Sequence, residues 1–400
     1  MAKPIIATID IGSSTTKGIV CQKLEDKDQY QVLAHSVLKS EGVRKGAVVD
    51  PQKTAEVLKK LKSRLEALSR TRIKNIVVNI NGHHIFVQPV KGAVAISRAD
   101  QKVSQEDIDR VQDEARATSL PLNKEVLDIY PREYIIDEEK GIKDPLGLRG
   151  IKLEMEGIVT CVFSPYLKNL KEAVASLDLN IVDIIPSPIA DAYALLTPQQ
   201  KELGVALIDI GAGTTSMAVF EEGQLIHLTV FPCGSSNISN DIAIALKTEI
   251  DIATRIKEEF GKLIFSKTNR KEKLKLDSGE VFVFSTREFS KAARARIEQI
   301  FNHIKKELKK INKHGKLPAG VVLTGGGSKI PGLVDYAKKE LSLPVRLGKL
   351  SKFIGPHLDE RFSVACGLAV FGLEEEEQEE EGVLSRITQA FRKIIKIFTP

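Results

Sequence analysis

The stretch IIATIDIGSSTTKGIV, residues 5–20, contains a short apolar run, an Asp-Ile-Gly turn with small hydroxyl residues, and a second apolar run. The same order returns in ALIDIGAGTTSMAVF at residues 206–220. Each apolar run is short and rich in β-branched residues, which predicts a buried strand. A strand–turn–strand unit that occurs twice predicts an α/β protein built from two similar halves.

The two turns carry residue types that suit a phosphate chain. Glycine lets backbone amides approach an anion, hydroxyl groups and lysine donate to phosphate oxygens, and carboxylates hold Mg²⁺ through its waters. We therefore predict that both turns close on one phosphate chain, although two unrelated glycine hairpins would share the pattern. The predicted phosphate-binding residues are Gly12, Ser13, Ser14, Thr15, Lys17, Gly211, Gly213, Thr214 and Thr215, and the predicted metal- and water-organising carboxylates are Asp10 and Asp209.

A third glycine-rich element is GVVLTGGGSKIPGL at residues 320–333. It predicts a strand, a turn of three glycines and a helix that opens near Pro331. A glycine-rich entry to a helix suits a phosphate, a base or a ribose. The spacing fits neither GxGxxG nor a P-loop. The candidate ligand-binding residues of this turn are Gly325, Gly326, Gly327 and Lys329.

Composition sets limits on the class of protein. The chain has 400 residues, 42% of them hydrophobic, and a net charge of +6. We expect two or more subdomains, no transmembrane helix and no signal peptide, and so a cytosolic protein. The four cysteines are far apart, which predicts neither a zinc site nor disulfides. No basic-aromatic motif indicates a nucleic-acid partner.

The end of the chain changes sign abruptly, from seven glutamates within residues 374–382 to a basic segment, residues 383–400. The glutamate run predicts an extended linker. The segment after it predicts an amphipathic helix that lies on an anionic membrane, although a helix docked on the protein's own core is the alternative. Its apolar face would hold Leu384, Ile387, Phe391, Ile394, Ile395 and Phe398, and its basic face Arg386, Arg392, Lys393 and Lys396.

DIGSSTTK, DIGAGTT and LTGGG, in that order, resemble the two phosphate motifs and the adenosine motif of the actin, sugar-kinase and chaperone ATPase superfamily. SPIADAYALL at 187–196 and ERFSVACGLAVFGL at 360–373 resemble its two connecting helices. The resemblance implies a two-lobed actin-like fold, duplicated and ribonuclease-H-like, with ATP and Mg²⁺ in the cleft between the lobes.

EVLDIYPREYIIDEEKGIKDPLGLRGIKLE at 125–154, VNINGHHI at 78–85 and LTPQQKELGVALIDIG at 196–211 resemble the bacterial cell-division FtsA family. This resemblance implies actin-like filaments at the cytoplasmic face of the inner membrane and a tether there for FtsZ at the division site. The expected organisation is a first lobe at 1–85 and 164–198 with a returning helix at 356–373, an inserted α+β subdomain at 86–163, a second lobe at 199–355, an acidic linker at 374–382 and a membrane helix at 383–400.

The resemblance also implies partners. The subdomain at about 237–315 would receive the C-terminal peptide of FtsZ, and its basic stretch 262–301, with Arg294 and Arg296, would attract an acidic, apolar peptide. The inserted subdomain has no evident catalytic pairing, so we expect it to bind other division proteins. The expected partners are FtsZ, further copies of the chain, anionic lipids and division proteins, without nucleic acid.

The sequence departs from the superfamily pattern near the expected γ-phosphate. The second phosphate motif has Ala212 and Ser216 where related proteins usually carry glycine and an acid, and the first connecting helix opens with Ser187 where an acid is frequent. Phosphoryl transfer needs an oriented nucleophile, so we expect slow ATP hydrolysis at most. Lys257 matches a family lysine near the adenosine, although a surface helix lysine is an equal alternative.

Two other functions fit parts of the pattern. A sugar kinase would need a catalytic aspartate beside a sugar pocket, and none is evident in the first half of the chain. A pilus-assembly adaptor with an actin-like fold would share the inserted subdomain but would not need the terminal membrane helix.

Overall fold

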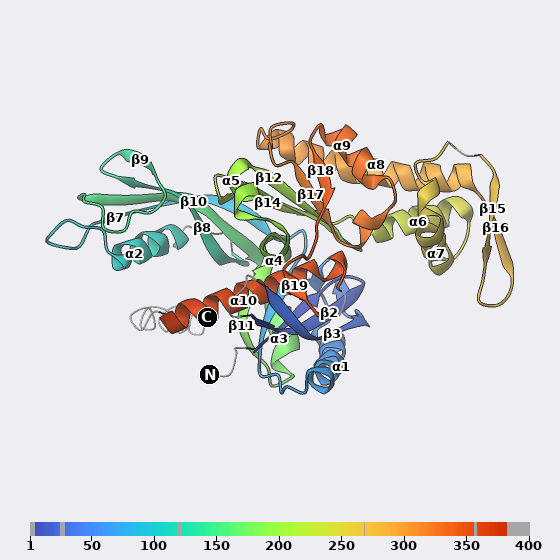
Figure 1. Cartoon of the computed structure of the whole chain (residues 1–400), viewed down its shortest axis with the longest axis horizontal. Helices are drawn as coiled ribbons and strands as arrows, with labels where there is room; N and C mark the ends of the chain where they lie inside the picture. Colours follow the sequence, from blue (N-terminus) through green and yellow to red (C-terminus); the bar gives the residue numbers. More distant parts are fainter. Residues whose placement is uncertain are drawn as a thin grey trace.

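The structure is a computed structural model, and Figure 1 shows two stacked α/β lobes, with a small inserted sheet at one end and a helical arm with a β-ribbon at the other. It describes residues 5–24, 29–117, 120, 122–267, 269–355 and 358–381. The membrane-helix prediction for 383–400 lies outside these residues.

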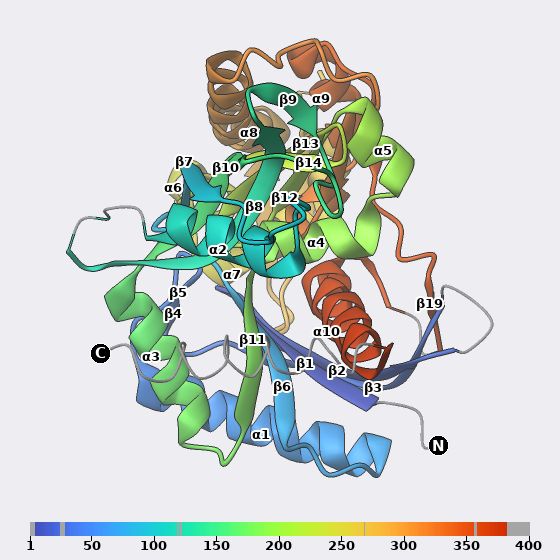
Figure 2. The same ribbon diagram turned by 90° about the vertical axis from the view of Figure 1, so that its left-hand side faces the viewer.

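The first lobe is a six-stranded mixed sheet with helices on both faces (Figure 2). Strands β1, β2 and β3 run antiparallel, and β6 and β11 follow in parallel beyond β1. Helix α1 (Pro51–Ser69) covers one face, and Asp50 caps it by accepting from the Lys53 amide at 3.1 Å. The strands in spatial order are β11 (Asn180–Pro186), β6 (Asn75–Ile80), β1 (Ile5–Ile11), β2 (Thr15–Lys23), β3 (Tyr30–Lys39) and β19 (Phe353–Ile354).

The second lobe repeats this plan in five strands. An antiparallel meander, β12 to β14, is extended in parallel from β12 by β17 and then β18. The two-lobed duplicated α/β fold predicted from the repeated turn is confirmed. The strands in spatial order are β14 (Gln224–Phe231), β13 (Thr215–Glu221), β12 (Val205–Ile210), β17 (Val321–Thr324) and β18 (Val345–Leu347).

Helices of the second lobe form the arm on the right of Figure 1. The longest, α8 (Thr286–Lys310), buries Phe289, Ala293 and Ile297 on one stripe, as the 3.6-residue period requires. A β-ribbon of β15 and β16 ends the arm. The remaining elements of this lobe are α6 (Ser235–Leu246), α7 (Ile250–Phe260), η1 (Gly261–Leu263), β15 (Lys271–Lys275), β16 (Val281–Ser285), η2 (Gly326–Lys329) and α9 (Leu333–Leu341).

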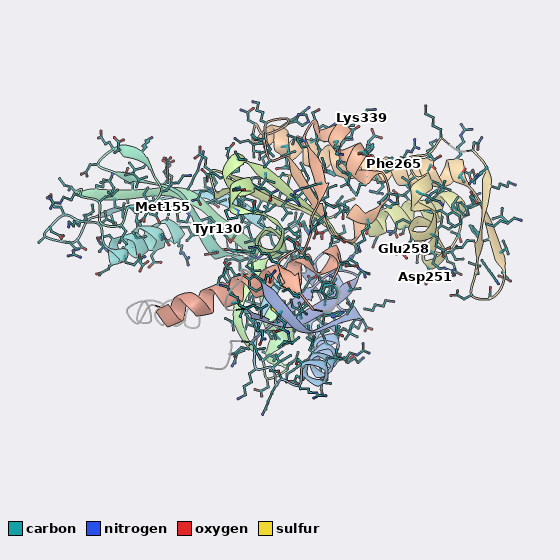
Figure 3. All side chains as sticks on the ribbon, in the orientation of Figure 1. Tyr130, Met155, Asp251, Glu258, Phe265 and Lys339 are labelled. Atoms are coloured by element: carbon teal, nitrogen blue, oxygen red, sulfur yellow. The ribbon has the colours of Figure 1, made fainter. Side chains whose placement is uncertain are left out.

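The predicted α+β insert is also present. One helix packs on a four-stranded antiparallel sheet, and Met155 is fully buried between them (Figure 3). Ser104 caps the helix in a capping box with Asp107. The elements are β7 (Phe86–Ala95), α2 (Gln105–Arg116), β8 (Lys124–Ile136), β9 (Glu139–Ile142) and β10 (Lys152–Phe163), with sheet order β7-β10-β8-β9.

Two connecting helices cross between the lobes. In α4 (Ser187–Leu195) and α10 (Ser363–Glu381), the small residues Ala190 and Gly367 bring the two backbones into close contact. Short elements complete the fold: β4 (Val43–Arg44), β5 (Ala47–Val48), α3 (Ser164–Ala175), α5 (Pro198–Leu203) and η3 (Glu360–Phe362).

One local expectation was wrong. The glutamate run is not extended through 374–382, because α10 continues as a helix to Glu381. Glutamate is a good helix former, and adding residues to an existing helix costs little once a buried segment has nucleated it. The helix expected near Pro331 is present as α9 and begins at Leu333, after a 3₁₀ turn.

The crossing of α4 and α10 predicts an unequal effect of two substitutions in one helix. A Cβ at Gly367 would overlap the Ala190 carbonyl, whereas a Cβ at Gly372 would meet the ends of the Ile6 and Val77 side chains, which can shift. We expect Gly367→Ala to lower the free energy of unfolding by about 1–3 kcal/mol. Gly372→Ala should be near neutral, because the helical preference for alanine offsets its contact. Denaturant unfolding of both variants measures this, and equal losses would contradict it.

Candidate functional site

The two glycine turns meet tip to tip between the lobes. Each hairpin closes the same way, with the Gly12 amide donating to the Thr15 carbonyl at 3.2 Å and the Gly211 amide to the Thr214 carbonyl at 2.9 Å. A Cβ added to Gly213 would lie 2.6 Å from the Ser13 hydroxyl oxygen. The structure therefore brings the two predicted phosphate turns together from opposite lobes.

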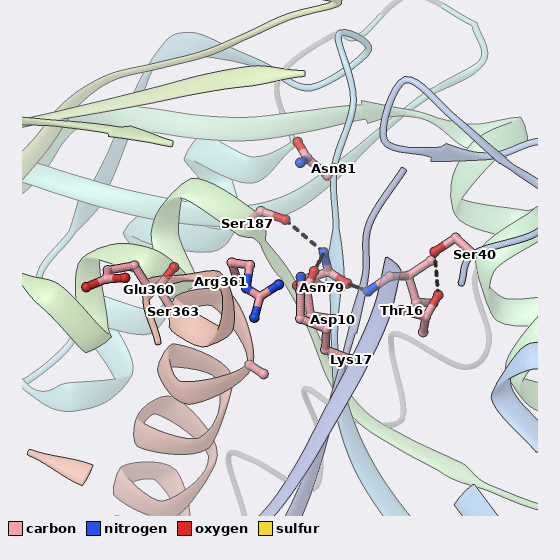
Figure 4. Close-up of polar contacts among 12 residues, drawn as sticks. Asp10, Thr16, Lys17, Ser40, Asn79, Asn81, Ser187, Glu360, Arg361 and Ser363 are labelled. Atoms are coloured by element: carbon pink, nitrogen blue, oxygen red, sulfur yellow. Dashed lines mark hydrogen bonds and ion pairs between the residues drawn. The ribbon is translucent and has the colours of Figure 1, made fainter. Parts of the chain in front are cut away.

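Asp10 is the centre of a polar network at the end of β1 (Figure 4). Lys17 lies directly opposite on β2, and its ammonium group is 2.6 Å from the Asp10 carboxylate. Asn79 on β6 donates to Asp10 at 3.0 Å and to the Ser187 hydroxyl at 2.9 Å. Its carbonyl oxygen accepts from the Ile11 amide at 2.6 Å. The buried Asn79 side chain thus joins β1 and β6 of the first lobe to the start of α4.

Asp209 is the equivalent carboxylate of the second lobe, and its surroundings differ. The residue opposite it on β13 is Ser216, not a lysine, and no described residue hydrogen-bonds the buried Ser216 hydroxyl. Burial and the nearby Asp10 charge raise the pKa of Asp209, while Lys17 lowers it. Of the two turn carboxylates, Asp10 therefore has a lysine opposite it, whereas Asp209 has no basic residue opposite it.

Asp191 on α4 is a third acid in this region and was not among the predicted site residues. Its side chain is fully buried, and the Ser363 hydroxyl is the hydrogen-bond neighbour that favours its ionised form. Burial, and then the charge of Asp209, raise its pKa well above the ordinary value. The Asp10, Asp191 and Asp209 carboxyls therefore influence one another where the two lobes meet.

The predicted hydroxyl donors have different partners in the structure. Ser13 accepts from the Gly46 amide at 2.8 Å, and Thr214 accepts from Asn81 at 3.4 Å. Thr215 donates to the Cys233 carbonyl at 2.8 Å, so its hydroxyl is engaged within the second lobe. The Ser14 carbonyl accepts from the Ser40 amide at 2.9 Å, and Thr15 begins β2.

The third glycine-rich turn packs against the end of β12. Gly325 has a φ of 81°, and a side chain there would collide with Asp209, so glycine is required twice over. Gly327 is pressed against Ile210 in the same way. Gly326 differs, because a Cβ there would meet no atom within 4 Å. Two of the three glycines thus serve packing, and Gly326 leaves open space.

The two predicted lysines of this half are both engaged. Lys329 is 2.7 Å from Asp359 and 3.5 Å from Glu360, so it joins the glycine turn to the segment before α10. Lys257 on α7 donates to the Ser235 carbonyl at 3.3 Å, and burial lowers its pKa. The Ser235 amide in turn donates to the Gly211 carbonyl at 2.8 Å, which connects Lys257 to the second phosphate turn.

Asn79 and Asp191 are the functional candidates that sequence reasoning missed. Each had a visible signal, because Asn79 is polar within the apolar strand NIVVNI and Asp191 is an acid within the apolar helix SPIADAYAL. A buried polar residue in an apolar element needs a partner or a purpose. That rule would have singled out both residues.

A separate basic pocket of about 610 Å³ lies on the arm of the second lobe. Its lining includes Lys267, Arg287, Lys291 and Arg294, with one acid, Glu298. Arg294 donates to the carbonyls of Ile264 and Ser266, which fixes its guanidinium group within the pocket wall. Arg296, which the sequence paired with Arg294 as a peptide attractor, instead forms a two-pronged ion pair with Asp241 at 2.7 and 2.9 Å.

The helices of the described residues were also compared with the requirements of a membrane span. None of them combines the length and the apolar character that crossing a bilayer needs.

Comparison with known proteins gives the family. A family model described as "Cell division protein FtsA" matches residues 206–367, and one described as "SHS2 domain inserted in FTSA" matches residues 82–161. Cell division protein FtsA of Pseudomonas aeruginosa is 34% identical over 93% of this chain and 90% of that protein. The protein of the same name from Bacillus subtilis is 32% identical over 92% of this chain and 83% of its own length.

Solved structures with low sequence identity share the fold. The "PilM-PilN type IV pilus biogenesis complex" matches with a TM-score of 0.67 at 18% identity, over 92% of this chain and 98% of that one. MreB5 of Spiroplasma citri bound to ADP matches with a TM-score of 0.58 at 14% identity, over 94% and 99%. These matches confirm the predicted actin-like fold. With about nine-tenths of both chains aligned to the Pseudomonas relative and a family insert at its expected place in the first lobe, this chain belongs to the FtsA family of cell division proteins.

Proposed function

We propose that this chain binds ATP between its lobes, assembles into actin-like filaments and tethers FtsZ to the cytoplasmic face of the inner membrane at the division site. The observation that carries the proposal is the meeting of two glycine turns from opposite lobes beside Asp10 and Asp209, in a chain of the FtsA family. We also propose that the inserted subdomain binds other division proteins.

The residues present fit a nucleotide with Mg²⁺. Asp209 lacks a basic partner across its hairpin, and the carboxyls of Asp10, Asp191 and Asp209 interact with a single lysine, Lys17. Such an excess of acid suits a hydrated cation, which Asp10 and Asp209 would hold through its waters. The cation would supply positive charge beside the phosphates. The two turns that begin at Gly12 and Gly211 would border the phosphates, and the open space at Gly326 would receive the base or ribose.

Hydrolysis is expected to be slow in this arrangement. At the start of α4, Ser187 is a neutral hydroxyl that accepts from Asn79, and Ser216 is neutral as well. Neither residue is a general base that could take a proton from attacking water. ATP would then act mainly as a ligand that sets the relative positions of the lobes, with turnover below about 1 per second.

The basic pocket on the arm is the proposed site for the C-terminal peptide of FtsZ. Its volume falls in the range of a ligand pocket, and the lining bases Lys267, Arg287 and Lys291 suit acidic side chains of a partner. The proposed contact region is therefore narrower than the basic stretch 262–301, and it excludes Arg296.

The membrane anchor is proposed from sequence alone, as the amphipathic segment 383–400. A pilus-assembly adaptor is the alternative function, and the likeness to a PilM structure supports it only at the level of the fold. Membrane tethering of FtsZ needs this segment, whereas a pilus-assembly adaptor does not.

Gly326 provides a test of nucleotide binding that should leave the fold intact. A side chain at this position meets no protein atom within 4 Å, so we expect Gly326→Ala and Gly326→Phe to melt like the parent protein. Affinity for ATP should fall with side-chain size, by about tenfold or more for Gly326→Phe, which corresponds to a loss of about 1.4 kcal/mol. Isothermal titration calorimetry measures the ATP affinity of each variant. Undiminished affinity in Gly326→Phe would contradict the proposal that the base or ribose lies beside Gly326.

The peptide pocket is tested by charge reversal at two places on α8. Lys291 lines the pocket, whereas Lys306 is exposed on the same helix outside it. We expect Lys291→Glu to weaken binding of a labelled FtsZ tail peptide by about 3- to 10-fold at low salt, with a smaller ratio at high salt. Lys306→Glu is the control for net charge. Equal weakening by both variants in fluorescence anisotropy would point to non-specific attraction.

The tail is tested by sedimentation with anionic liposomes. Full-length protein should co-sediment, and protein lacking residues 383–400 should stay in the supernatant, because the apolar face provides the insertion energy. Phe391→Glu should release the protein, whereas Gln389→Glu, on the opposite face, should release much less of it at the same charge. Unchanged sedimentation of the truncated protein would favour the pilus-adaptor alternative.

A further inference from the structure

A short segment at the entry to the inserted subdomain touches both phosphate turns. This junction segment comprises residues 81–84, which join β6 of the first lobe to β7 of the insert. Asn81 donates to the Thr214 hydroxyl of the second turn at 3.4 Å. A Cβ on Gly46 would lie 2.9 Å from the segment's backbone, and the Gly46 amide donates to the Ser13 hydroxyl of the first turn at 2.8 Å. The position of the junction segment therefore depends on both turns.

Hydrogen bonds within the junction segment hold His84 to Asn81. The Gly82 amide donates to the Asn81 side-chain oxygen at 2.8 Å, and Nε2 of His84 lies 3.0 Å from the Asn81 backbone carbonyl oxygen. Burial lowers the pKa of His84 to about 4, so the ring is neutral near pH 7. Nε2 must then carry the proton, because a carbonyl oxygen only accepts. A single donated hydrogen bond thus ties the ring to the residue that contacts the second turn.

Aromatic contacts continue from His84 to the other end of the insert. The His84 ring centroid is 4.8 Å from that of Tyr166 on α3, and Tyr166 is 5.5 Å from Phe163, the last residue of β10. Within the insert, the Lys124 ammonium group lies 4.3 Å from the Phe86 ring centroid, which joins the starts of β8 and β7. Both chain connections between the first lobe and the insert are therefore in one row of contacts.

The insert also contacts the second lobe. Lys143 donates to the Glu222 carbonyl at 2.8 Å and lies 3.6 Å from the Glu202 carboxylate, and strands β7 and β8 lie beside β14. The insert is thus joined covalently to the first lobe and non-covalently to the second. A change in the position of one lobe relative to the other must alter one of these two attachments.

We propose that the junction segment couples the phosphate turns to the insert, so that bound nucleotide changes the orientation of the insert relative to the second lobe. A phosphate group that binds both turns would set their spacing, and with it the position of Thr214 relative to Asn81. The contacts through His84, Tyr166 and Phe163 carry this displacement to the insert. The inference rests on the proposed ATP binding and extends it, because the surface that the insert presents to a partner would then depend on nucleotide.

The test measures the distance between two spin labels by double electron–electron resonance in the full-length protein. The labels are attached at Glu139→Cys on the insert and at Lys339→Cys on α9 of the second lobe. Both positions are exposed, and the four native cysteines are buried, so the labels react at the introduced sites. We expect saturating ATP to shift the mean distance by about 2 Å or more.

One substitution in the junction segment should separate this shift from nucleotide binding. His84→Phe keeps a ring beside Tyr166 and removes the hydrogen bond to Asn81. It should bind ATP within about twofold of the parent affinity by calorimetry and lose about half of the shift or more. His303→Phe is the matched control, because His303 also stacks on a ring, that of Phe231, and lies on α8 outside the junction segment. It should keep both the affinity and the shift.

The outcomes separate the coupling from ATP binding. If the parent protein binds ATP without a shift, or if His84→Phe shifts as the parent does, the coupling is wrong while ATP binding stands. If the parent protein binds no ATP, both proposals fail. Loss of ATP affinity together with the shift in His84→Phe would mean that the segment only positions the second turn, which also overturns the inference. Tyr166→Leu, which breaks the aromatic contact at the other end, must reproduce the loss of the shift if His84→Phe does not fold.

Discussion

The contact between two glycine turns, one from each lobe, is the constraint on which the rest of the structure depends. Gly213 has no room for a side chain, because the Ser13 hydroxyl occupies that space, and the Asp10 and Asp209 carboxylates come close enough to influence each other. Separate lobes would leave each turn as an ordinary hairpin. Their contact joins the two turns into one polar centre. The packing of α4 on α10 and the hydrogen bonds of Asn79 to Asp10 and Ser187 stabilise this centre.

The two lobes contain similar strand–turn–strand hairpins, but the residues that face their acids differ in charge. In both hairpins the acid faces a residue across an antiparallel register, but this residue is Lys17 in the first and Ser216 in the second. Asp10 forms a cross-strand ion pair with Lys17, whereas burial and the charge of Asp10 raise the pKa of Asp209. The asymmetry gives the site a preferred place for added positive charge, which two identical halves would lack.

The sequence predicted the repeated strands, the insert and the meeting of the turns, because strand periodicity and glycine turns are local signals. It could not show that Gly325 and Gly327 are needed for packing while Gly326 faces open space, since this depends on β12 from another part of the chain. It likewise could not show that Arg294 lines the basic pocket while Arg296 does not, since Arg296 pairs with Asp241, 55 residues away. The extended linker was mispredicted because self-repulsion was weighed above helix propagation from the buried half of α10.

Helix α10 begins beside the cleft, where Ser363 accepts from Thr324, and it runs unbroken for 19 residues to Glu381. At 1.5 Å per residue, this is a rod of about 28 Å. Residues 364–373 of this helix are packed in the core against the first lobe, so the rod moves with that lobe, and a rotation of about 10° about its base would carry its far end through roughly 5 Å. The direction of the chain at Glu381 is therefore set by the orientation of the first lobe.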